Sequence, residues 1–164
     1  MIGPSEGKAR AARRPTASPV FSTLDDEDAR SLLRRNRVGR IAFSFHDRVD
    51  VEPVHYVFDE QWLFGRTSPG SKLSVVRHNP WVAFEVDEPS DTFDWQSVVV
   101  HGTVYVLEPD GPPSTTHAWA RAMELLQEVV PGSGTADDPV PHRTVVFGIH
   151  VDEIIGRAAT TAAR

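Results

Sequence analysis

Alternating hydrophobic and polar residues dominate the middle of the chain. Ile41, Phe43 and Phe45 alternate with small or polar residues, and this period of two predicts a strand with one apolar face. Two similar runs, residues 49–58 and 61–66, follow after short polar turns. Three consecutive strands joined in this way predict an antiparallel meander.

The rest of the chain adds three more strands and three helical segments. The further strands are predicted at residues 81–86, 95–107 and 144–151. Helical spacing predicts a short helix after Thr23 that closes at Gly39, two helical turns at 71–78, and an amphipathic helix at 115–130.

Six antiparallel strands with helices only at the edges predict a mainly β fold, a closed or partly closed barrel with short flanking helices. Closure removes the free strand edges that an open meander would expose. Residues 1–20 are rich in Gly, Pro, Ser, Ala and Arg, and we expect a disordered basic tail there. We expect one folded domain over residues 21–157, a flexible loop at 131–141 and an unstructured tail at 158–164.

Composition excludes several kinds of site. The chain has no cysteine, which excludes disulfides, thiolate nucleophiles, zinc–thiolate sites and iron–sulfur clusters. Its 17 Lys and Arg residues against 23 Asp and Glu residues give a net charge of −6, a poor match for nucleic acid or an anionic membrane surface. No run reaches the roughly 20 apolar residues that a membrane span needs. We therefore expect a cytoplasmic protein that binds neither nucleic acid nor a membrane.

The segment from Arg66 to Lys72 concentrates hydrogen-bond donors in this acidic chain. It joins a predicted strand to a predicted helix, where unpaired backbone N–H groups favour an anion. Arg66 and Lys72 add two cations, and Thr67 and Ser71 add hydroxyl donors. The segment therefore predicts a phosphate site. The alternative is a capped helix, with Ser71 as N-cap and both cations merely exposed.

A series of sequence blocks, in a fixed order, also carries a family resemblance. The blocks are residues 38–43 (VGRIAF), 51–56 (VEPVHY), 64–73 (FGRTSPGSKL), 82–87 (VAFEVD), 95–102 (WQSVVVHG) and 147–158 (FGIHVDEIIGRA). Over residues 21–158 the chain thereby resembles the pyridoxamine 5′-phosphate oxidase-like flavoproteins, which fold as FMN-binding split β-barrels.

The resemblance implies a homodimer with two flavins in clefts between its subunits. It assigns the FMN phosphate to Arg66, Thr67, Ser71 and Lys72. It places the strand that holds Pro53, Val54, His55 and Tyr56 along the isoalloxazine and ribityl groups, largely through its backbone. The strand that holds Ser97 and Val98 would approach the ring from the other side.

We expect a departure from the true oxidases of this family, because the sequence shows no Arg-rich segment after Arg157 that resembles their C-terminal extension. It is closer to the smaller branch of nitroimidazole-resistance-type reductases and deazaflavin-coenzyme users. Two functions follow: an oxidoreductase that uses FMN, or a deazaflavin, on a small-molecule substrate, and a non-catalytic protein that stores or senses a flavin, deazaflavin or haem. No catalytic side chain is assigned, since the cofactor would carry the chemistry.

The seven histidines show no metal-ligand spacing, so no metal site is predicted. His55 is the histidine that we place nearest the cofactor, where a catalytic or haem-ligand role competes with a hydrogen-bonded structural one.

Overall fold

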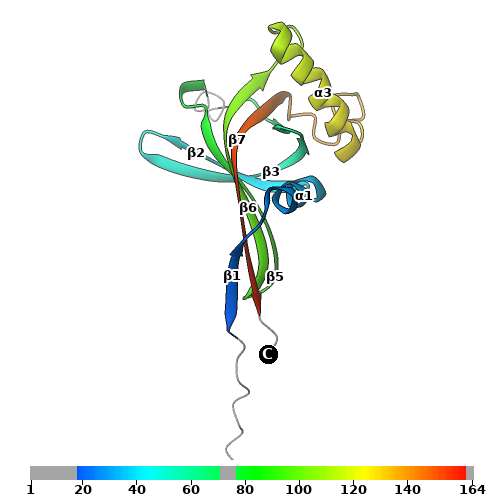
Figure 1. Ribbon diagram of the computed structural model, residues 1–164. Coiled ribbons are helices and arrows are strands. Elements are labelled where there is room, and N and C mark those ends of the chain that lie inside the picture. The colour runs from blue at the N-terminus through cyan, green and yellow to red at the C-terminus, as the bar shows by residue number, and fades with distance from the viewer. Residues whose placement is uncertain (1–17, 71–76, 162–164) are drawn as a thin grey trace, which may run out of the picture.

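The computed structural model describes residues 18–70 and 77–161. Within these ranges the chain forms seven strands and two helices, shown in Figure 1. The elements in chain order are β1 (Pro19–Thr23), α1 (Asp26–Arg35), β2 (Val38–Phe45), β3 (Arg48–Asp59), β4 (Trp62–Thr67), β5 (Trp81–Asp91), β6 (Asp94–Leu107), α3 (Pro113–Val129) and β7 (Val145–Thr161). No helix among these residues is long and apolar enough to cross a membrane.

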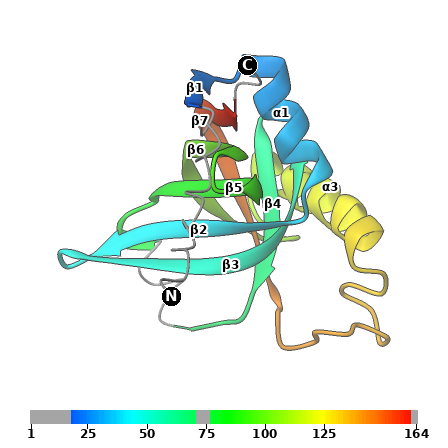
Figure 2. The ribbon, with the colours of Figure 1, turned by 90° about the horizontal axis from the view of Figure 1, so that it is seen from below.

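Six of the strands close into a ring in the order β7–β4–β3–β2–β5–β6, and β6 pairs with β7 again. Every pairing is antiparallel, so the predicted mainly β split barrel is confirmed. β2 and β3 form a long hairpin on one side, while α1 and α3 lie on the other (Figure 2). The far ends of β5, β6 and β7, together with β1, extend from the barrel as an arm (Figure 1).

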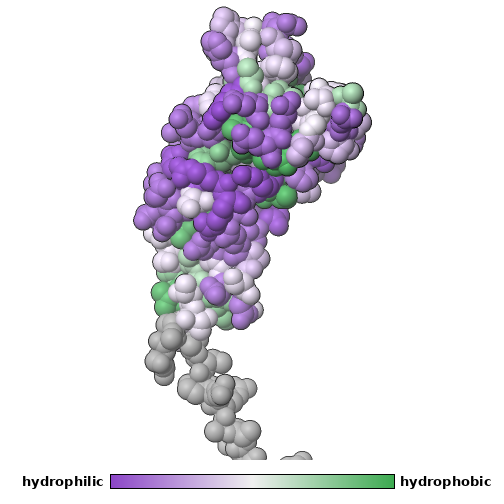
Figure 3. All heavy atoms as spheres, turned by 90° about the vertical axis from the view of Figure 1, so that its right-hand side faces the viewer, coloured by the Kyte–Doolittle hydropathy of each residue, from purple (hydrophilic) through white to green (hydrophobic). Residues whose placement is uncertain are grey.

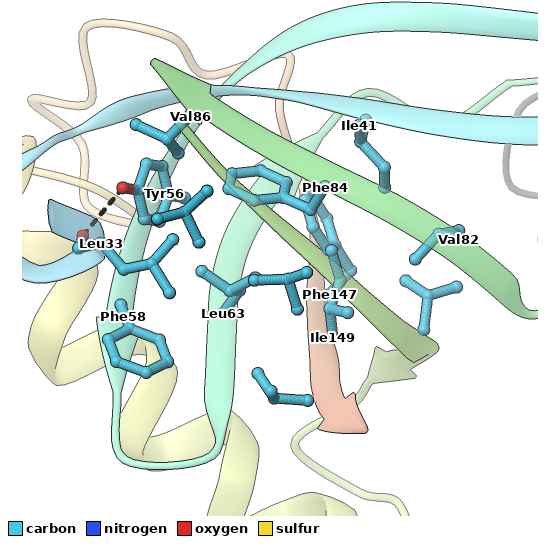
Figure 4. Close-up of a cluster of buried hydrophobic side chains, with 14 of the residues drawn as sticks. Leu33, Ile41, Tyr56, Phe58, Leu63, Val82, Phe84, Val86, Phe147 and Ile149 are labelled. Atoms are coloured by element: carbon cyan, nitrogen blue, oxygen red, sulfur yellow. Dashed lines mark hydrogen bonds between the residues drawn. The ribbon is translucent and has the colours of Figure 1, made fainter. Parts of the chain in front are cut away.

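Two hydrophobic clusters hold the barrel and its helices together. The larger cluster combines inward-facing strand residues with Ala29, Leu32 and Leu33 of α1, so α1 packs into the main core. Figure 4 shows part of this core, in which the Tyr56 hydroxyl group donates a hydrogen bond to the Leu33 carbonyl group. The smaller cluster joins α3 to side chains of β3, β4, β6 and β7.

The helix termini differ from the prediction. Asp25, rather than Thr23, is the N-cap of α1, and its carboxylate accepts a hydrogen bond from the Asp28 N–H at 2.8 Å. Thr23 belongs to β1, where it pairs with Arg157. Gly39 does not end the helix but lies in β2, where a Cβ atom would stand 2.2 Å from the Phe84 ring. The glycine is needed there for close packing.

Both expected tail boundaries are wrong by a few residues. β1 begins at Pro19, and β7 continues to Thr161 instead of ending near Val151. The two strands pair along their whole shared length, from Pro19 opposite Thr161 to Thr23 opposite Arg157. The small alanine and threonine side chains at the end of β7 show no clear alternation of hydrophobic and polar residues. The pairing also connects the two ends of the described chain, so no local pattern indicates it. Residues 1–17 and 162–164 of the predicted tails lie outside the described residues.

Candidate binding site

A cavity of about 350 Å³ lies where β4 ends and the chain turns away from the barrel. We call it the basic cleft. Its lining residues come from β3, from the end of β4 and the segment that follows it, and from the loop that joins α3 to β7: Glu52, Pro53, Val54, Arg66, Thr67, Ser68, Pro69, Gly70, His142 and Arg143. The cleft thus contains the first half of the predicted phosphate segment. Ser71 and Lys72 lie outside the described residues, so their part remains a prediction.

Arg66 is a buried cation at the wall of this cleft. Its side chain is 8% exposed. Its Nε donates to the Arg143 carbonyl oxygen at 2.9 Å, and its Nη2 donates to Asp138 Oδ2 at 2.6 Å. Its Nη1 is buried without a hydrogen-bond partner among the described residues. A buried donor left in this way is costly, and it indicates a place for a ligand acceptor.

Asp138 comes from the α3–β7 loop (residues 130–144), which covers Arg66. Its carboxylate is 4% exposed and also accepts hydrogen bonds from the backbone N–H groups of Gly134 and Val140, at 2.7 and 2.9 Å. The Arg66 guanidinium group and these N–H groups favour the ionised form, so they hold the pKa of Asp138 well below its usual range. Arg66 and Asp138 therefore fasten the loop to β4.

Arg143 is a second cation at the cleft. Its Nη1 lies 3.4 Å from His55 Nδ1, and no carboxylate among the described residues lies within ion-pair distance of it. Arg143, His55 and Arg66 also line a neighbouring cavity of about 180 Å³ beneath α3. A cation without a carboxylate partner, in a chain with a net charge of −6, supports an anion site here.

Two thirds of β3 has only one strand partner in the described ladder. Residues Arg48 to His55 pair with β2, whereas the pairing with β4 covers only Tyr56 to Asp59. Pro53 and Val54 line the cleft on the side of β3 that has no strand partner in the described ladder. Both residues therefore line the same cleft as Arg66 and Thr67, and their contact with a cofactor stays a prediction.

The structure places the Tyr56 side chain in the core instead of the cleft. Tyr56 is 1% exposed and packs edge-on against Phe84, with their ring centroids 4.9 Å apart. Its hydroxyl group donates to the Leu33 carbonyl oxygen at 2.8 Å, and its backbone N–H donates to the Arg37 carbonyl oxygen at 3.0 Å. Burial raises the pKa of this phenol. Tyr56 thus joins β3 to the end of α1.

Ser97 and Val98 do not line the basic cleft of the same chain. Val98 is fully buried in the main core, whereas the half-buried Ser97 donates from its hydroxyl group to Glu85 at 3.1 Å. Ser97 shares the outer face of the sheet with Glu85, Arg40 and Asp87, where Arg40 forms ion pairs with both acids. A contact between Ser97 and a cofactor in this cleft would therefore need a second subunit.

The same outer face exposes hydrophobic side chains, including Val38, Val49, Val51 and Trp81, which are between 52% and 69% exposed. The register places Val51 opposite Ala42, and Ala42 opposite Ala83, so small and apolar residues run across β3, β2 and β5. The side of the molecule that carries the helices is mostly hydrophilic by contrast, with hydrophobic residues in narrow areas (Figure 3).

Sequence reasoning missed three residues of the site: Asp138, His142 and Arg143, all in the α3–β7 loop. Its Gly and Pro content indicated flexibility, and no local pattern connects Asp138 with Arg66, which lies 72 positions away. The one sequence signal is the basic pair His142–Arg143 immediately before the last strand. Among the described residues, no three His, Asp or Glu side chains are arranged as a metal site.

Comparison with known proteins gives consistent matches over nearly the whole domain. The family model described as pyridoxamine 5′-phosphate oxidase matches residues 25–158. A crystal structure of an FAD-binding protein from Mesorhizobium loti is 27% identical, with a TM-score of 0.69, over 87% of this chain and 99% of that one. A conserved protein of unknown function from Corynebacterium diphtheriae is 30% identical, with a TM-score of 0.65, over 85% of this chain and 98% of that one.

A further solved structure supports the fold alone. The FAD-binding protein from Mycobacterium smegmatis is 21% identical, with a TM-score of 0.62, and the match covers 85% of this chain and 99% of that one. The split-barrel architecture is therefore shared with proteins whose names state flavin binding.

Proposed function

Because the chain belongs to the pyridoxamine 5′-phosphate oxidase family, we propose that it binds a flavin nucleotide with the phosphate in the basic cleft. Thr67, Arg143 and the free Nη1 of Arg66 would hold the phosphate, together with Ser71 and Lys72. The flavin would be FMN, or FAD as in the similar Mesorhizobium loti protein.

One observation carries this proposal: the buried Nη1 of Arg66 has no acceptor among the described residues. A phosphate oxygen is a strong acceptor for a guanidinium group, and charge-assisted bonds of this kind are short and strong. Arg143, which has no carboxylate partner in the described part of the chain, adds a second positive charge at the same cavity. The cleft therefore suits an anion, and membership of the family suggests that this anion is the phosphate group of a flavin.

The bound flavin would supply hydride or electron transfer, and this chain's residues would bind and orient it. The Pro53 carbonyl group, on the edge of β3 that β4 does not cover, would accept a hydrogen bond from a polar group of the cofactor. His55, next to Arg143, lies on the same strand. We propose an oxidoreductase that acts on a small molecule.

We further propose that the protein works as a homodimer. The exposed apolar face of β2, β3 and β5 would be covered by a second copy, because contiguous apolar surface of this kind marks an interface. This arrangement would also bring Ser97 of the partner subunit to a cofactor that Ser97 of the same chain does not contact. The proposed dimer and the proposed contact of both subunits with the cofactor thus depend on each other.

A binding protein without turnover is the second candidate. It is favoured by the similar Mesorhizobium loti protein, whose name states FAD binding and no activity. Such a protein would hold a flavin, deazaflavin or haem through the same contacts. Reduction separates the two functions: an enzyme's flavin is bleached by a nicotinamide donor and reoxidised by an acceptor, whereas a storage protein's flavin stays oxidised.

The direct test is titration of the purified protein with FMN and FAD, followed by flavin fluorescence, with the mass in solution measured alongside. Arg143→Gln should weaken flavin binding by at least about tenfold, since a charged hydrogen bond contributes about 1.5–3 kcal/mol. Arg121→Gln is the matched control, because Arg121 pairs with Asp59 and Glu124 on exposed surface outside the cleft. Equal affinities of both variants and the wild type would contradict the phosphate assignment.

A further inference from the structure

Arg66 already has a counter-ion before any ligand enters the basic cleft. The Asp138 carboxylate lies 2.6 Å from Arg66 Nη2, and both side chains are more than nine-tenths buried. Two backbone N–H groups of the α3–β7 loop hold the same carboxylate in place. Asp138 is therefore fixed by the fold of its own loop and does not depend on a ligand for its position.

The guanidinium group is left with one free nitrogen. Nε donates to the Arg143 carbonyl and Nη2 donates one of its two N–H groups to Asp138, so Nη1 is the nitrogen that has no partner for its N–H groups among the described residues. A phosphate at Nη1 would share the positive charge of Arg66 with Asp138. It would also be repelled by that carboxylate across a few ångströms of protein, where charges interact more strongly than in water.

From this arrangement we infer that Asp138 is an internal counter-ion that weakens the hold of the basic cleft on the phosphate of its ligand and stabilises the protein when the cleft is empty. The inference rests on the proposed function and concerns the same site. Its functional consequence is that the cleft binds the flavin phosphate less tightly than the same cleft would without the Asp138 carboxylate.

The physical reason is linkage between folding and binding. A buried Arg66 without Asp138 would be an uncompensated charge, and removing one partner of a buried pair is strongly destabilising. A bound anion would then supply the missing counter-charge, so it would stabilise the folded state more in the absence of Asp138 than in its presence. Loss of Asp138 should therefore lower the stability of the empty protein and raise its affinity for anions at the same time.

The chain offers a matched control in the neighbouring residue. Asp137 is exposed in the same loop, and no ion pair of its carboxylate is found among the described residues. Asp137→Asn makes the same change in charge and in side-chain chemistry as Asp138→Asn, one position away. A general effect of net charge would act on both variants, whereas an effect through Arg66 would act on Asp138→Asn alone.

The experiment measures the thermal midpoint without ligand and the dissociation constants of FMN and of inorganic pyrophosphate. Asp138→Asn should have a lower midpoint than the wild type and bind both probes at least about tenfold more tightly, since a nearby negative charge has been removed. Asp137→Asn should resemble the wild type in both measurements.

The double variant Arg66→Met with Asp138→Asn separates the counter-ion role from damage to the loop. With both charges gone, the midpoint should recover above that of Asp138→Asn, and the gain in affinity should disappear. Should Asp138→Asn fail to fold without ligand, this double variant decides the matter: a folded double variant supports the counter-ion role, and an unfolded one overturns it.

The remaining outcomes distinguish the two proposals. If pyrophosphate binds Asp138→Asn more tightly than the wild type while no variant binds FMN or FAD, the flavin assignment fails and the role of Asp138 stands. If FMN binds the wild type and Asp138→Asn equally well, or binds the variant more weakly, Asp138 only positions Arg66 and the inference is overturned. It is also overturned if no variant binds either probe.

Discussion

Replacement of Tyr56 by phenylalanine tests whether this residue belongs to the core or to the cofactor site. The structure gives its hydroxyl group one partner, the Leu33 carbonyl oxygen at 2.8 Å, in a position where Tyr56 is 1% exposed. Phenylalanine keeps the ring and its edge-on contact with Phe84 but leaves that carbonyl without this donor. The change should therefore affect stability and leave flavin affinity unaltered.

The expected loss is about 1–2 kcal/mol, because a buried hydrogen bond contributes roughly 1 kcal/mol and an orphaned buried acceptor adds its desolvation penalty. In a protein of this size that corresponds to a fall of about 2–8 °C in the melting temperature. Circular dichroism during thermal and urea unfolding measures the loss. Tyr105→Phe is the control, since Tyr105 is 44% exposed and no hydrogen bond of its hydroxyl group is found among the described residues.

We also expect the stabilities of the wild type and Tyr56→Phe to respond differently to alkaline pH. Because burial raises the pKa of Tyr56, the folded protein holds this proton more tightly than the unfolded chain. Its contribution to stability is complete below the unfolded pKa of about 10 and is lost as the pH rises above it. The wild type should therefore lose stability above pH 10 more steeply than Tyr56→Phe. Weaker flavin binding by Tyr56→Phe without any loss of stability would refute this placement.

Two further predictions concern packing and acid stability. Gly39→Ala should destabilise the protein by about 1–3 kcal/mol through overpacking, because its Cβ atom would lie 2.2 Å from the Phe84 ring. Urea unfolding measures this loss. Gly70→Ala is the control and should leave the urea midpoint unchanged, because a Cβ atom there would meet open space. Since the pKa of Asp138 is held below its usual range, the Arg66–Asp138 pair stabilises the fold above pH 4 and loses this effect as the pH falls further. The midpoints of wild type and Asp138→Asn should therefore converge below pH 4, and a constant difference would contradict the ion pair's role.

The sequence predicted most strands correctly because their signal is local. Alternation gave the β2–β3–β4 meander, and helical spacing at 115–130 agrees with α3 at Pro113–Val129 to within two residues. Six antiparallel strands with helices only at the edges then indicated a barrel, because closure removes free strand edges. β1 escaped prediction because its partner, the end of β7, lies at the other end of the described chain.

The candidate site was predictable only where its residues are neighbours in sequence. Arg66 and Thr67 were found through their position before a helical segment, and Pro53 and Val54 through the family resemblance. The apolar residues on both faces of the second half of β3 gave no sign that Tyr56 points into the core. Asp138 and Arg143 could not be predicted, since their contacts with Arg66 and His55 depend on how the α3–β7 loop folds back over β4.

The position of β7 in chain order has a consequence during synthesis. This strand closes the ring by pairing with both β4 and β6, and it follows every other ring strand. A nascent chain that has emerged from the ribosome only as far as the α3–β7 loop therefore has two open strand edges flanking an exposed apolar interior. Such edges are templates for aggregation. Chaperone contact should accordingly be greatest just before β7 leaves the exit tunnel, and variants that slow β7 docking should reduce the yield of folded protein more than their equilibrium stability indicates.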